Sequence, residues 1–292
     1  MSNLLRLRLL PAATVASLVL GMTSVGPASV SARTNASCDP AVSFDPGGFS
    51  DSTHVDNTWY PLVPGTQFVF DGYADRGGGV LPHRIIFTVT NLTKLIDGVQ
   101  TVVLFDRDLD DGQLVEAELA FQAQDSVGNV WSLGEYPEEY EDGAFIGAPS
   151  TWMSGQADAE AGILMLADPA LGSSYYLQGR APAIDFLDCA KVFKTGEVAC
   201  VPSTCYENVL VTDERSPLDP GSGSQRKHHA PAVGVVQVTA VGDKEGETLA
   251  LVGVEHLSRR ALTQVREEVL KLEKHAYRVS DVYRQTAPMT GG

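Results

Sequence analysis

The sequence has few basic residues for its acidic content. This deficit limits the kinds of partner that the protein can bind. Lys and Arg total 21 against 37 Asp and Glu, which gives a formal net charge of −16. Such a chain repels nucleic-acid phosphates and anionic lipid head groups, and its charge favours solubility or cation binding. We therefore exclude nucleic acid as a partner, and the sequence leaves the protein partner undetermined.

The sequence also lacks the motifs of several catalytic and metal sites. No G-x-S-x-G nucleophile elbow occurs, and the four cysteines form no CxxC pair of the kind found in tetrahedral zinc sites. No βαβ alternation is visible, and after the first 32 residues no apolar run is long enough to span a bilayer. The sequence thus indicates no cofactor and favours a non-enzymatic role.

The first 32 residues have the pattern of a secretory signal peptide. Arg6 and Arg8 precede an apolar run, which ends at the small residues Val30-Ser31-Ala32. This order predicts cleavage after Ala32. We expect a secreted or periplasmic product, with no transmembrane segment in the mature chain.

All four cysteines lie in the predicted exported portion, where an oxidising compartment permits disulfides. Four cysteines allow three pairings. Cys200 and Cys205 flank a four-residue connection between two predicted strands. We predict a Cys200–Cys205 bridge, with Cys38 and Cys189 left over or paired.

The middle of the chain is predicted to be antiparallel β structure. In residues 114–124 the positions Val115, Ala117, Leu119, Phe121 and Ala123 alternate with polar or small ones, so one face is expected to be buried and the other to meet water or a groove. Asp-Gly pairs at 71–72, 97–98, 111–112 and 142–143 are typical of tight hairpin turns. The predicted fold is mainly β: a curved antiparallel sheet or open barrel, lipocalin-like or lipid-carrier-like.

Near the C-terminus, residues 258–283 carry apolar side chains at spacings of three and four, which predicts an amphipathic helix. We expect it to pack on the sheet as a lid, or alternatively to dock onto a partner. The predicted organisation is a signal peptide at 1–32, an irregular lead-in at 33–56, the β domain at 57–257, the helix at 258–283 and a tail at 284–292.

One acidic segment resembles a calcium loop but lacks its key residues. An EF-hand that begins at Asp106 requires Gly at its sixth position and Glu at its twelfth, whereas this chain has Asp111 and Ala117 there. A nonclassical Ca²⁺ site formed by Asp106, Asp108, Asp110 and Asp111 is the functional hypothesis. The alternative, which we favour, is a solvated hairpin tip.

A second acidic segment follows a predicted strand at 130–136 and is interpreted as a long loop that ends near Gly155. It carries Glu138, Glu139, Glu141 and Asp142, close to Glu135 and two tyrosines. Paired carboxylates beside aromatic side chains are typical of glycosidase clefts. A solvated loop surface is the more ordinary interpretation.

The aromatic side chains supply candidates for a ligand groove. In a curved sheet that is closed by a helix, the concave face is a natural site for an apolar ligand. The candidate groove residues are Trp59, Tyr60, Trp131, Glu135 and Tyr136.

Three segments resemble an uncharacterised family of exported bacterial β-rich proteins. They are Pro61-Leu62-Val63-Pro64-Gly65-Thr66, the run from Gln124-Asp125 through Gly128-Asn129-Val130-Trp131 to Gly134-Glu135, and Ala230-Pro231-Ala232-Val233-Gly234-Val235. The resemblance covers residues 57–254 and implies a β-rich exported domain. It supplies no catalytic residues. The chain departs from the family pattern at Ser132, at Ala232, where Gly is common, and at His228-His229.

The leading functional hypothesis is an exported, non-catalytic binding or envelope protein for an apolar or amphipathic small ligand. One alternative is a secreted glycan or ester hydrolase, assisted by Ca²⁺, which uses carboxylates such as Glu135 and Asp108. Another is an interaction module that docks through its C-terminal helix. Neither the ligand nor the oligomeric state follows from the sequence.

Overall fold

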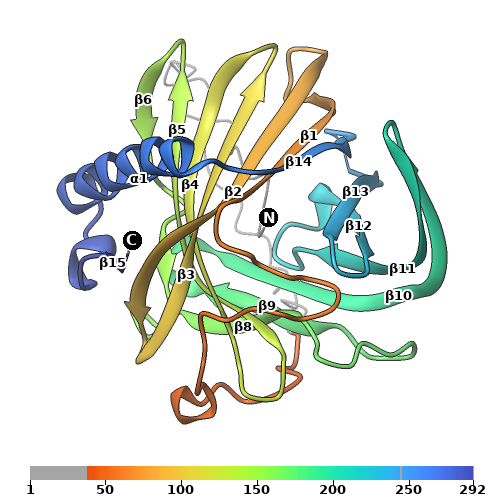
Figure 1. Cartoon of the computed structure of the whole chain (residues 1–292), viewed down its shortest axis with the longest axis horizontal. Helices are drawn as coiled ribbons and strands as arrows, with labels where there is room; N and C mark the ends of the chain where they lie inside the picture. The colour runs from red at the N-terminus through yellow and green to blue at the C-terminus, as the bar shows by residue number, and fades with distance from the viewer. Residues whose placement is uncertain (1–37, 244, 292) are drawn as a thin grey trace, which may run out of the picture.

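The computed structural model describes residues 38–243 and 245–291, so the predicted signal peptide lies outside the described residues. Twelve antiparallel strands form a closed ring (Figure 1). They are β1 (Thr66–Asp75), β2 (Val80–Ile96), β3 (Val99–Asp110), β4 (Gln113–Gln124), β5 (Val130–Glu141), β8 (Glu160–Met165), β9 (Tyr176–Ala181), β10 (Phe186–Val201), β11 (Thr204–Arg215), β12 (Ser224–Ala230), β13 (Gly234–Val241) and β14 (Thr248–His256).

Three short strands extend this sheet. β6 (Ala144–Gly147) and β7 (Trp152–Met153) pair with β5, and β15 (Thr290–Gly291) pairs with β2. Four 3-10 turns lie in the connections: η1 (Pro46–Gly48), η2 (Pro182–Ile184), η3 (Pro220–Ser222) and η4 (Tyr283–Gln285).

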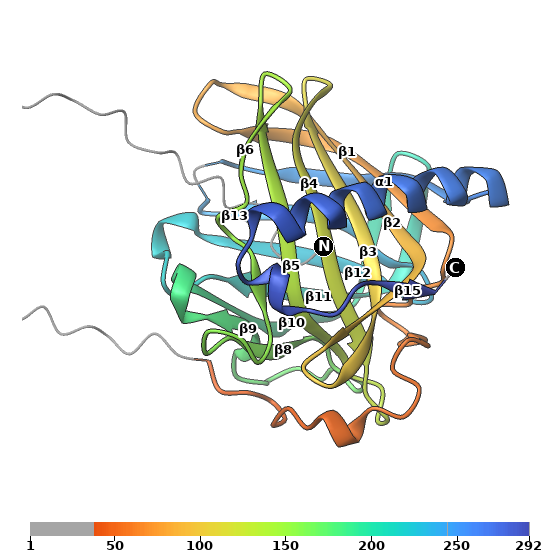
Figure 2. The ribbon, with the colours of Figure 1, turned by 90° about the vertical axis from the view of Figure 1, so that its left-hand side faces the viewer.

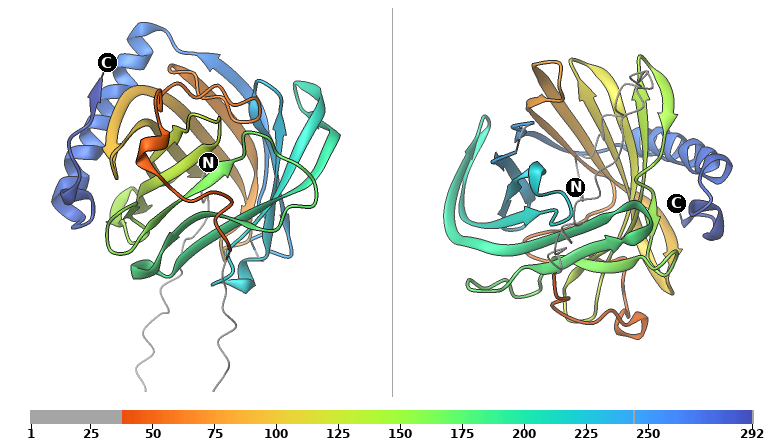
Figure 3. Two further views of the ribbon diagram at one scale, coloured as in Figure 1. Left: turned by 90° about the horizontal axis from the view of Figure 1, so that it is seen from below. Right: turned by 180° about the vertical axis from the view of Figure 1, so that it is seen from behind.

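The predicted antiparallel β fold is confirmed, and the barrel is closed rather than open. Closure follows from β1, which has a partner on each edge: Gln67 is opposite Thr88 of β2 and opposite Glu255 of β14. Within the described residues, closure gives each of the twelve ring strands a neighbour on both sides, which removes the free edges of an open sheet. Two views in Figure 3 show the strands surrounding a common interior.

Three of the four Asp-Gly pairs form hairpin turns, but the pair at 71–72 does not. Asp97, Asp111 and Asp142 have φ of 47°, 46° and 50°, and each is followed by a glycine that also has positive φ. This is the backbone of a type I′ turn. The exception, Gly72, lies inside β1, where a Cβ would come within 1.6 Å of the Thr248 carbonyl oxygen. Glycine at 72 therefore permits a close strand approach rather than a turn.

The predicted acidic loop after residue 136 is wrong. β5 continues through Glu141 and turns at Asp142-Gly143 into β6. The strand persists because its alternate side chains are buried on both sides: Glu139 lies opposite Glu116 of β4, and Glu138 bonds to side chains on the other face. Tertiary contacts thus override the low strand propensity of glutamate and proline.

The predicted C-terminal helix is present as α1 (Arg259–Val279), capped by Ser258, whose side chain accepts from the Ala261 amide. It runs across the outside of the barrel over β2 to β5 (Figure 2). Its buried apolar side chains are Val265, Val269, Leu272 and Ala276. No helix in residues 38–243 or 245–291 combines the length and apolar character needed to cross a membrane.

The barrel wall beneath α1 has an unusual polarity, which β4 illustrates. Its apolar side chains, such as Leu119 and Phe121, share a core cluster with α1 on the outside. Its alternate side chains, Glu116, Glu118 and Gln122, therefore line the inside, because successive strand residues point to opposite faces. The barrel interior is consequently polar on this wall.

Two disulfides join the described residues. Cys200 and Cys205 are linked across the β10–β11 hairpin with Cα atoms 3.9 Å apart, and Cys38 is linked to Cys189 of β10 with Cα atoms 6.1 Å apart. The second bridge ties the irregular lead-in to the barrel. Such bridges are typical of proteins that fold outside the reducing cytoplasm.

Candidate functional site

The five aromatic and acidic groove candidates do not gather in one place. Tyr60 lines the barrel interior, and Glu135 borders an interior pocket between β5 and β11. Trp131 and Tyr136 belong to the outer cluster beneath α1 and the lead-in, whereas Trp59 packs partly against the interior core. The candidates therefore divide between the two faces of the wall.

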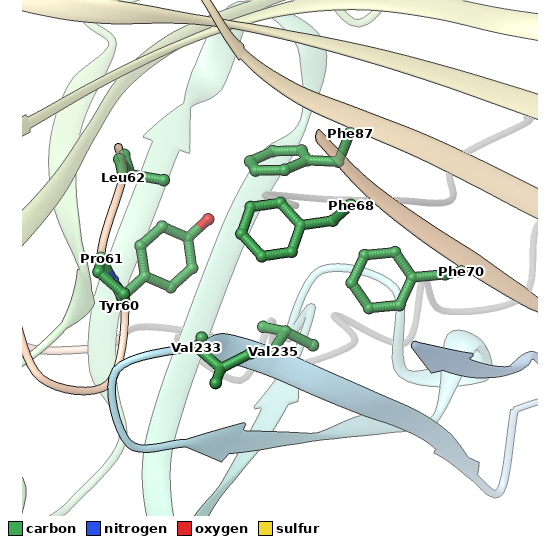
Figure 4. A pocket seen from close by; sticks show the side chains of 9 residues that line it. Tyr60, Pro61, Leu62, Phe68, Phe70, Phe87, Val233 and Val235 are labelled. Atoms are coloured by element: carbon green, nitrogen blue, oxygen red, sulfur yellow. The ribbon is translucent and has the colours of Figure 1, made fainter. Parts of the chain in front are cut away.

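The interior pocket around Tyr60 is apolar but nearly filled. Phe68, Phe70 and Phe87 converge on it from β1 and β2, opposite Val235 of β13 (Figure 4). Its volume is about 20 Å³. That is room for a water molecule rather than for an organic ligand.

The acidic segment of β3 is buried inside the barrel, so the solvated hairpin tip is wrong for Asp106 and Asp108. Asp106 lies opposite Phe87 and Glu118, and residues directly opposite each other share a face. Asp106 and Asp108 are 4% and 2% exposed, whereas Asp111 is exposed at the turn. β3 continues through Asp110, which pairs with His83 of β2 and whose carboxylate lies 2.7 Å from His83 Nδ1.

These carboxylates do not form a recognisable metal site. Within the described ranges, no group of three or more His, Cys, Asp or Glu side chains is arranged to hold a metal ion. Arg76 instead lies near two of them, 3.5 Å from Asp108 and 3.4 Å from Asp110. His83 is also 3.2 Å from Glu247. The interior acids are thus partly neutralised by side chains of the barrel itself.

Burial shifts the protonation of this cluster. It raises the pKa of Asp108 to about 8, and the nearby Asp106 charge adds to the effect. Burial likewise raises the pKa of Asp106 to about 6. For His83, burial favours the neutral form, but hydrogen bonds to Asp110 and Glu247 prevail and raise its pKa to about 9. The pKa values of Asp106, Asp108 and His83 therefore lie between about 6 and about 9.

We expect folding stability to fall as the pH rises from about 5 to about 9. A carboxyl group whose folded pKa exceeds its unfolded value binds more protons when folded, so raising the pH through that window favours unfolding. His83 acts in the same direction, since its stabilising charge is lost as the pH rises through its folded pKa of about 9. Thermal unfolding followed by circular dichroism across this range measures the slope.

The variant Asp108→Asn isolates the largest of these effects. Because it removes the buried charge, it should raise stability at about pH 9 by at least about 1 kcal/mol, or about 2–4 °C in Tm, and change little at about pH 5. Asp111→Asn is the control, because Asp111 is exposed. Parallel pH profiles for the wild type and Asp108→Asn would contradict the assignment.

A groove of ligand size lies on the outside of the barrel, between α1 and strands β2 to β5. Its volume is about 550 Å³, within the range of about 300–1,000 Å³ that is usual for small-molecule sites. Six of its lining side chains are apolar: Ile86, Phe105, Leu109, Leu114, Ala117 and Leu272. Six are polar: Arg107, Glu138, Tyr140, Glu268, Lys271 and His275.

Glu138 is the buried polar centre of this groove. Its Oε1 accepts from Tyr136 OH at 2.5 Å and lies 2.7 Å from His275 Nδ1, and its Oε2 accepts from Tyr140 OH at 2.7 Å. Burial, followed by the bond to Glu138, raises the pKa of both tyrosines. The carboxylate charge is therefore met by three neighbours. His275 in turn packs edge-on against Phe145, with ring centres 4.7 Å apart.

The rim of the groove carries two cations. Arg107 on β3 lies 3.7 Å from the half-exposed Glu268, and its guanidinium stands 5.2 Å from the Phe105 ring. Lys271 on α1 is exposed and has no ion pair among the described residues. The sequence patterns did not single out Arg107, Lys271 or the joint role of Glu138 and His275. The Tyr-x-Glu-x-Tyr alternation at 136–140 was the available signal, because it places all three side chains on one face of a strand.

Comparisons with known proteins found only distant structural similarities. The chain matches no protein-family model and no curated protein. A structure described as a "putative lipoprotein" from Parabacteroides distasonis is similar at a TM-score of 0.39 and 16% identity, covering 68% of this chain and 99% of that one. A "putative exported protein with YmcC-like fold" from Bacteroides fragilis gives a TM-score of 0.35 and 12% identity, with the same coverage. At these scores neither neighbour informs on function.

Proposed function

We propose that this protein is an exported, non-catalytic binding protein that holds an amphipathic small molecule in the groove beneath α1. The groove itself carries the proposal, since it combines ligand-sized volume, an apolar floor and a polar rim. The two disulfides support a site of action outside the cytoplasm. The predicted signal peptide agrees with this.

The chemistry of the groove supports binding more than catalysis. Neither serine, threonine nor cysteine is among its described lining residues, and His275 is engaged by Glu138. Asp108 and Glu135, the carboxylates of the hydrolase alternative, lie on or border the barrel interior and do not line the groove. Docking of α1 to a partner is less favoured, because its apolar face is already buried against the barrel.

The uncharged fluorophore N-phenyl-1-naphthylamine tests this proposal. It should bind the full mature protein with increased fluorescence. Leu114→Trp adds bulk to the partly buried groove wall and should weaken binding by about tenfold or more, equivalent to about 1.4 kcal/mol. Leu171→Trp, at an exposed loop position outside the groove, is the matched control and should bind as the wild type does.

If the fluorophore does not bind, or if Leu114→Trp and Leu171→Trp bind it with equal affinity, the groove is not the ligand site. Circular dichroism of each variant shows whether the barrel remains folded.

A further inference from the structure

We infer that the groove beneath α1 selects an amphipathic anion: a single-chain carboxylate whose head group meets Arg107, Lys271 and His275 while its alkyl chain lies on the apolar floor. This inference rests on the proposed function and names its ligand class. It depends on which charges at the groove are already neutralised and which remain available.

The negative charge of Glu138 is already satisfied. This side chain is 1% exposed and has three close partners, Tyr136, Tyr140 and His275. Of these partners, Tyr140 and His275 line the groove, and their bonds to Glu138 compensate its charge there. Charge-assisted hydrogen bonds of this kind hold their donors in place.

The positive charges of the groove are less well satisfied. Arg107 has a single acidic neighbour, Glu268, at 3.7 Å, which exceeds a hydrogen-bond distance, and its buried Nε atom has no hydrogen bond to a described residue. Lys271 lies one helical turn from Glu268 and has neither a hydrogen bond nor an ion pair in the described part of the chain. A guanidinium with unused donors is suited to bind a carboxylate.

His275 adds a third polar contact at the same groove. Its Nδ1 atom is committed to Glu138 at 2.7 Å, and the ring is about one-third exposed. The opposite ring nitrogen, Nε2, has no hydrogen bond among the described residues, so it remains available at the groove. With protons on both nitrogens, the ring can donate to Glu138 through Nδ1 and to a carboxylate through Nε2.

The apolar floor of the groove indicates that the rest of the ligand is an alkyl chain. Phe105, Leu109 and Leu114 come from β3 and β4, and Leu272 faces them from α1. Each methylene group buried there should strengthen binding about fourfold. An alkyl chain of moderate length therefore supplies affinity, whereas the cations supply the preference for an anion. This local preference contrasts with the net charge of −16 of the whole chain.

Three twelve-carbon probes with different head groups test the inference by displacement of N-phenyl-1-naphthylamine from the full mature protein, below their micelle concentrations. They are dodecanoate, the uncharged dodecanamide and the cationic dodecyltrimethylammonium. Dodecanoate should bind at least about tenfold more tightly than dodecanamide, and the cation should bind most weakly. Equal affinities, or a preference for the cation, would overturn the inference while the proposed function stands.

Variants that remove a positive charge show which side chains cause the preference for dodecanoate. Arg107→Gln with Lys271→Gln should abolish the roughly tenfold preference for dodecanoate over dodecanamide, measured as the ratio of the two affinities in the same variant. Lys271→Gln alone should show part of this loss, and its exposed position keeps folding intact. Lys274→Gln is the matched control, because Lys274 is exposed on the same helix but does not line the groove. An unchanged preference in the double variant would contradict the assignment.

The remaining outcomes separate the two proposals. If the fluorophore itself does not bind, the proposed function fails. If it binds and none of the three probes displaces it, the inference of a single-chain ligand is overturned. If the protein instead binds phosphatidylglycerol vesicles but not free dodecanoate, the groove faces a lipid surface and the inference of a free single-chain ligand is overturned.

Discussion

Replacing Lys94 by methionine is expected to lower the free energy of unfolding by about 3–5 kcal/mol, because it leaves the largely buried carboxylate of Glu273 without its cation. Lys94 lies on β2, fully buried beneath α1. Its Nζ donates to Glu273 Oε1 at 3.0 Å, to Tyr277 OH at 3.2 Å and to the Ala287 carbonyl oxygen at 2.6 Å. One ammonium group therefore joins the barrel, the helix and the C-terminal tail.

Other contacts of the same pair raise the expected cost. The Lys94 ammonium stands 4.3 Å from the centre of the Tyr283 ring, a favourable cation–π distance. Glu273 Oε1 also accepts from the Met289 amide at 2.9 Å, which fixes the tail after η4. Loss of the lysine should therefore loosen both α1 and the tail, and it should weaken ligand binding in the groove that α1 covers.

Urea unfolding followed by circular dichroism measures the effect of Lys94→Met. The double variant Lys94→Met/Glu273→Gln should recover part of the loss, since it removes the unpaired charge but keeps an acceptor for the Met289 amide. Lys274→Met is the control on the exposed face of α1 and should change stability by less than about 0.5 kcal/mol. Should Lys94→Met prove no more costly than Lys274→Met, the pair does not anchor the helix.

The sequence pattern predicted the two-faced character of β4 but not which face lies inside. Alternation identifies Leu119 and Phe121 as one face and Glu118 and Gln122 as the other. In most sheets with one solvated side the apolar face is the inner one. Here the apolar face is outside, because α1 covers it, and that arrangement depends on a helix more than 130 residues later in the chain. Local periodicity carries no information on such a distant partner.

The groove beneath α1 could not be predicted from the sequence, for the same reason. Tyr136, Glu138 and Tyr140 lie on one strand, but His275 and Lys271 come from α1, and Arg107 comes from β3. The amphipathic helix was predicted correctly, and its polar residues looked like an ordinary solvated face. Only the packing of α1 shows that two of them border an apolar floor.

The segment that resembles an exported family at 124–131 has a structural explanation. Gln124 Oε1 accepts from the Asp56 and Asn57 amides at 3.0 and 2.8 Å, and Asn129 Oδ1 accepts from the Ala167 amide at 2.8 Å. These bonds tie the lead-in and the segment just after β8 to the β4–β5 turn. The segment therefore organises one end of the barrel.

Ala232 shows a related departure from the family pattern. It stands where that family commonly has glycine, and its φ is 62°, in the left-handed region that favours glycine. Its amide donates to the Thr58 carbonyl oxygen at 2.7 Å, so the turn is held in place despite the alanine. A glycine at this position would adopt the same backbone conformation without strain.

The largest effect within the 124–131 segment is expected for Asp125→Ala, which should lower the free energy of unfolding by about 3–4 kcal/mol. Asp125 Oδ1 accepts from the amides of Val127 and Asn129 at 3.1 and 2.8 Å, and its Oδ2 accepts from Asn129 Nδ2 at 2.7 Å and Trp131 Nε1 at 2.8 Å. Hydrogen bonds to a charged group contribute about 1.5–3 kcal/mol each, although they are not additive. Trp131 is 2% exposed, so its indole N–H would be left buried without an acceptor.

The variant Asp125→Asn separates charge from shape at this turn. It keeps an acceptor oxygen but places an amide group against the donors, so we expect a loss of about 1–2 kcal/mol, smaller than for Asp125→Ala. Urea unfolding monitored by tryptophan fluorescence reports both values. Asp168→Ala serves as the control, because Asp168 is exposed and has no side-chain hydrogen bond among the described residues.

The ring of Trp131 also packs against Phe44 and Phe49 of the lead-in, with ring centres 5.5 and 6.0 Å away. Asp125→Ala should therefore also detach the lead-in and increase its cleavage by protease. A variant that unfolds at the same urea concentration as Asp168→Ala would show that packing alone, without the carboxylate, holds this end of the barrel.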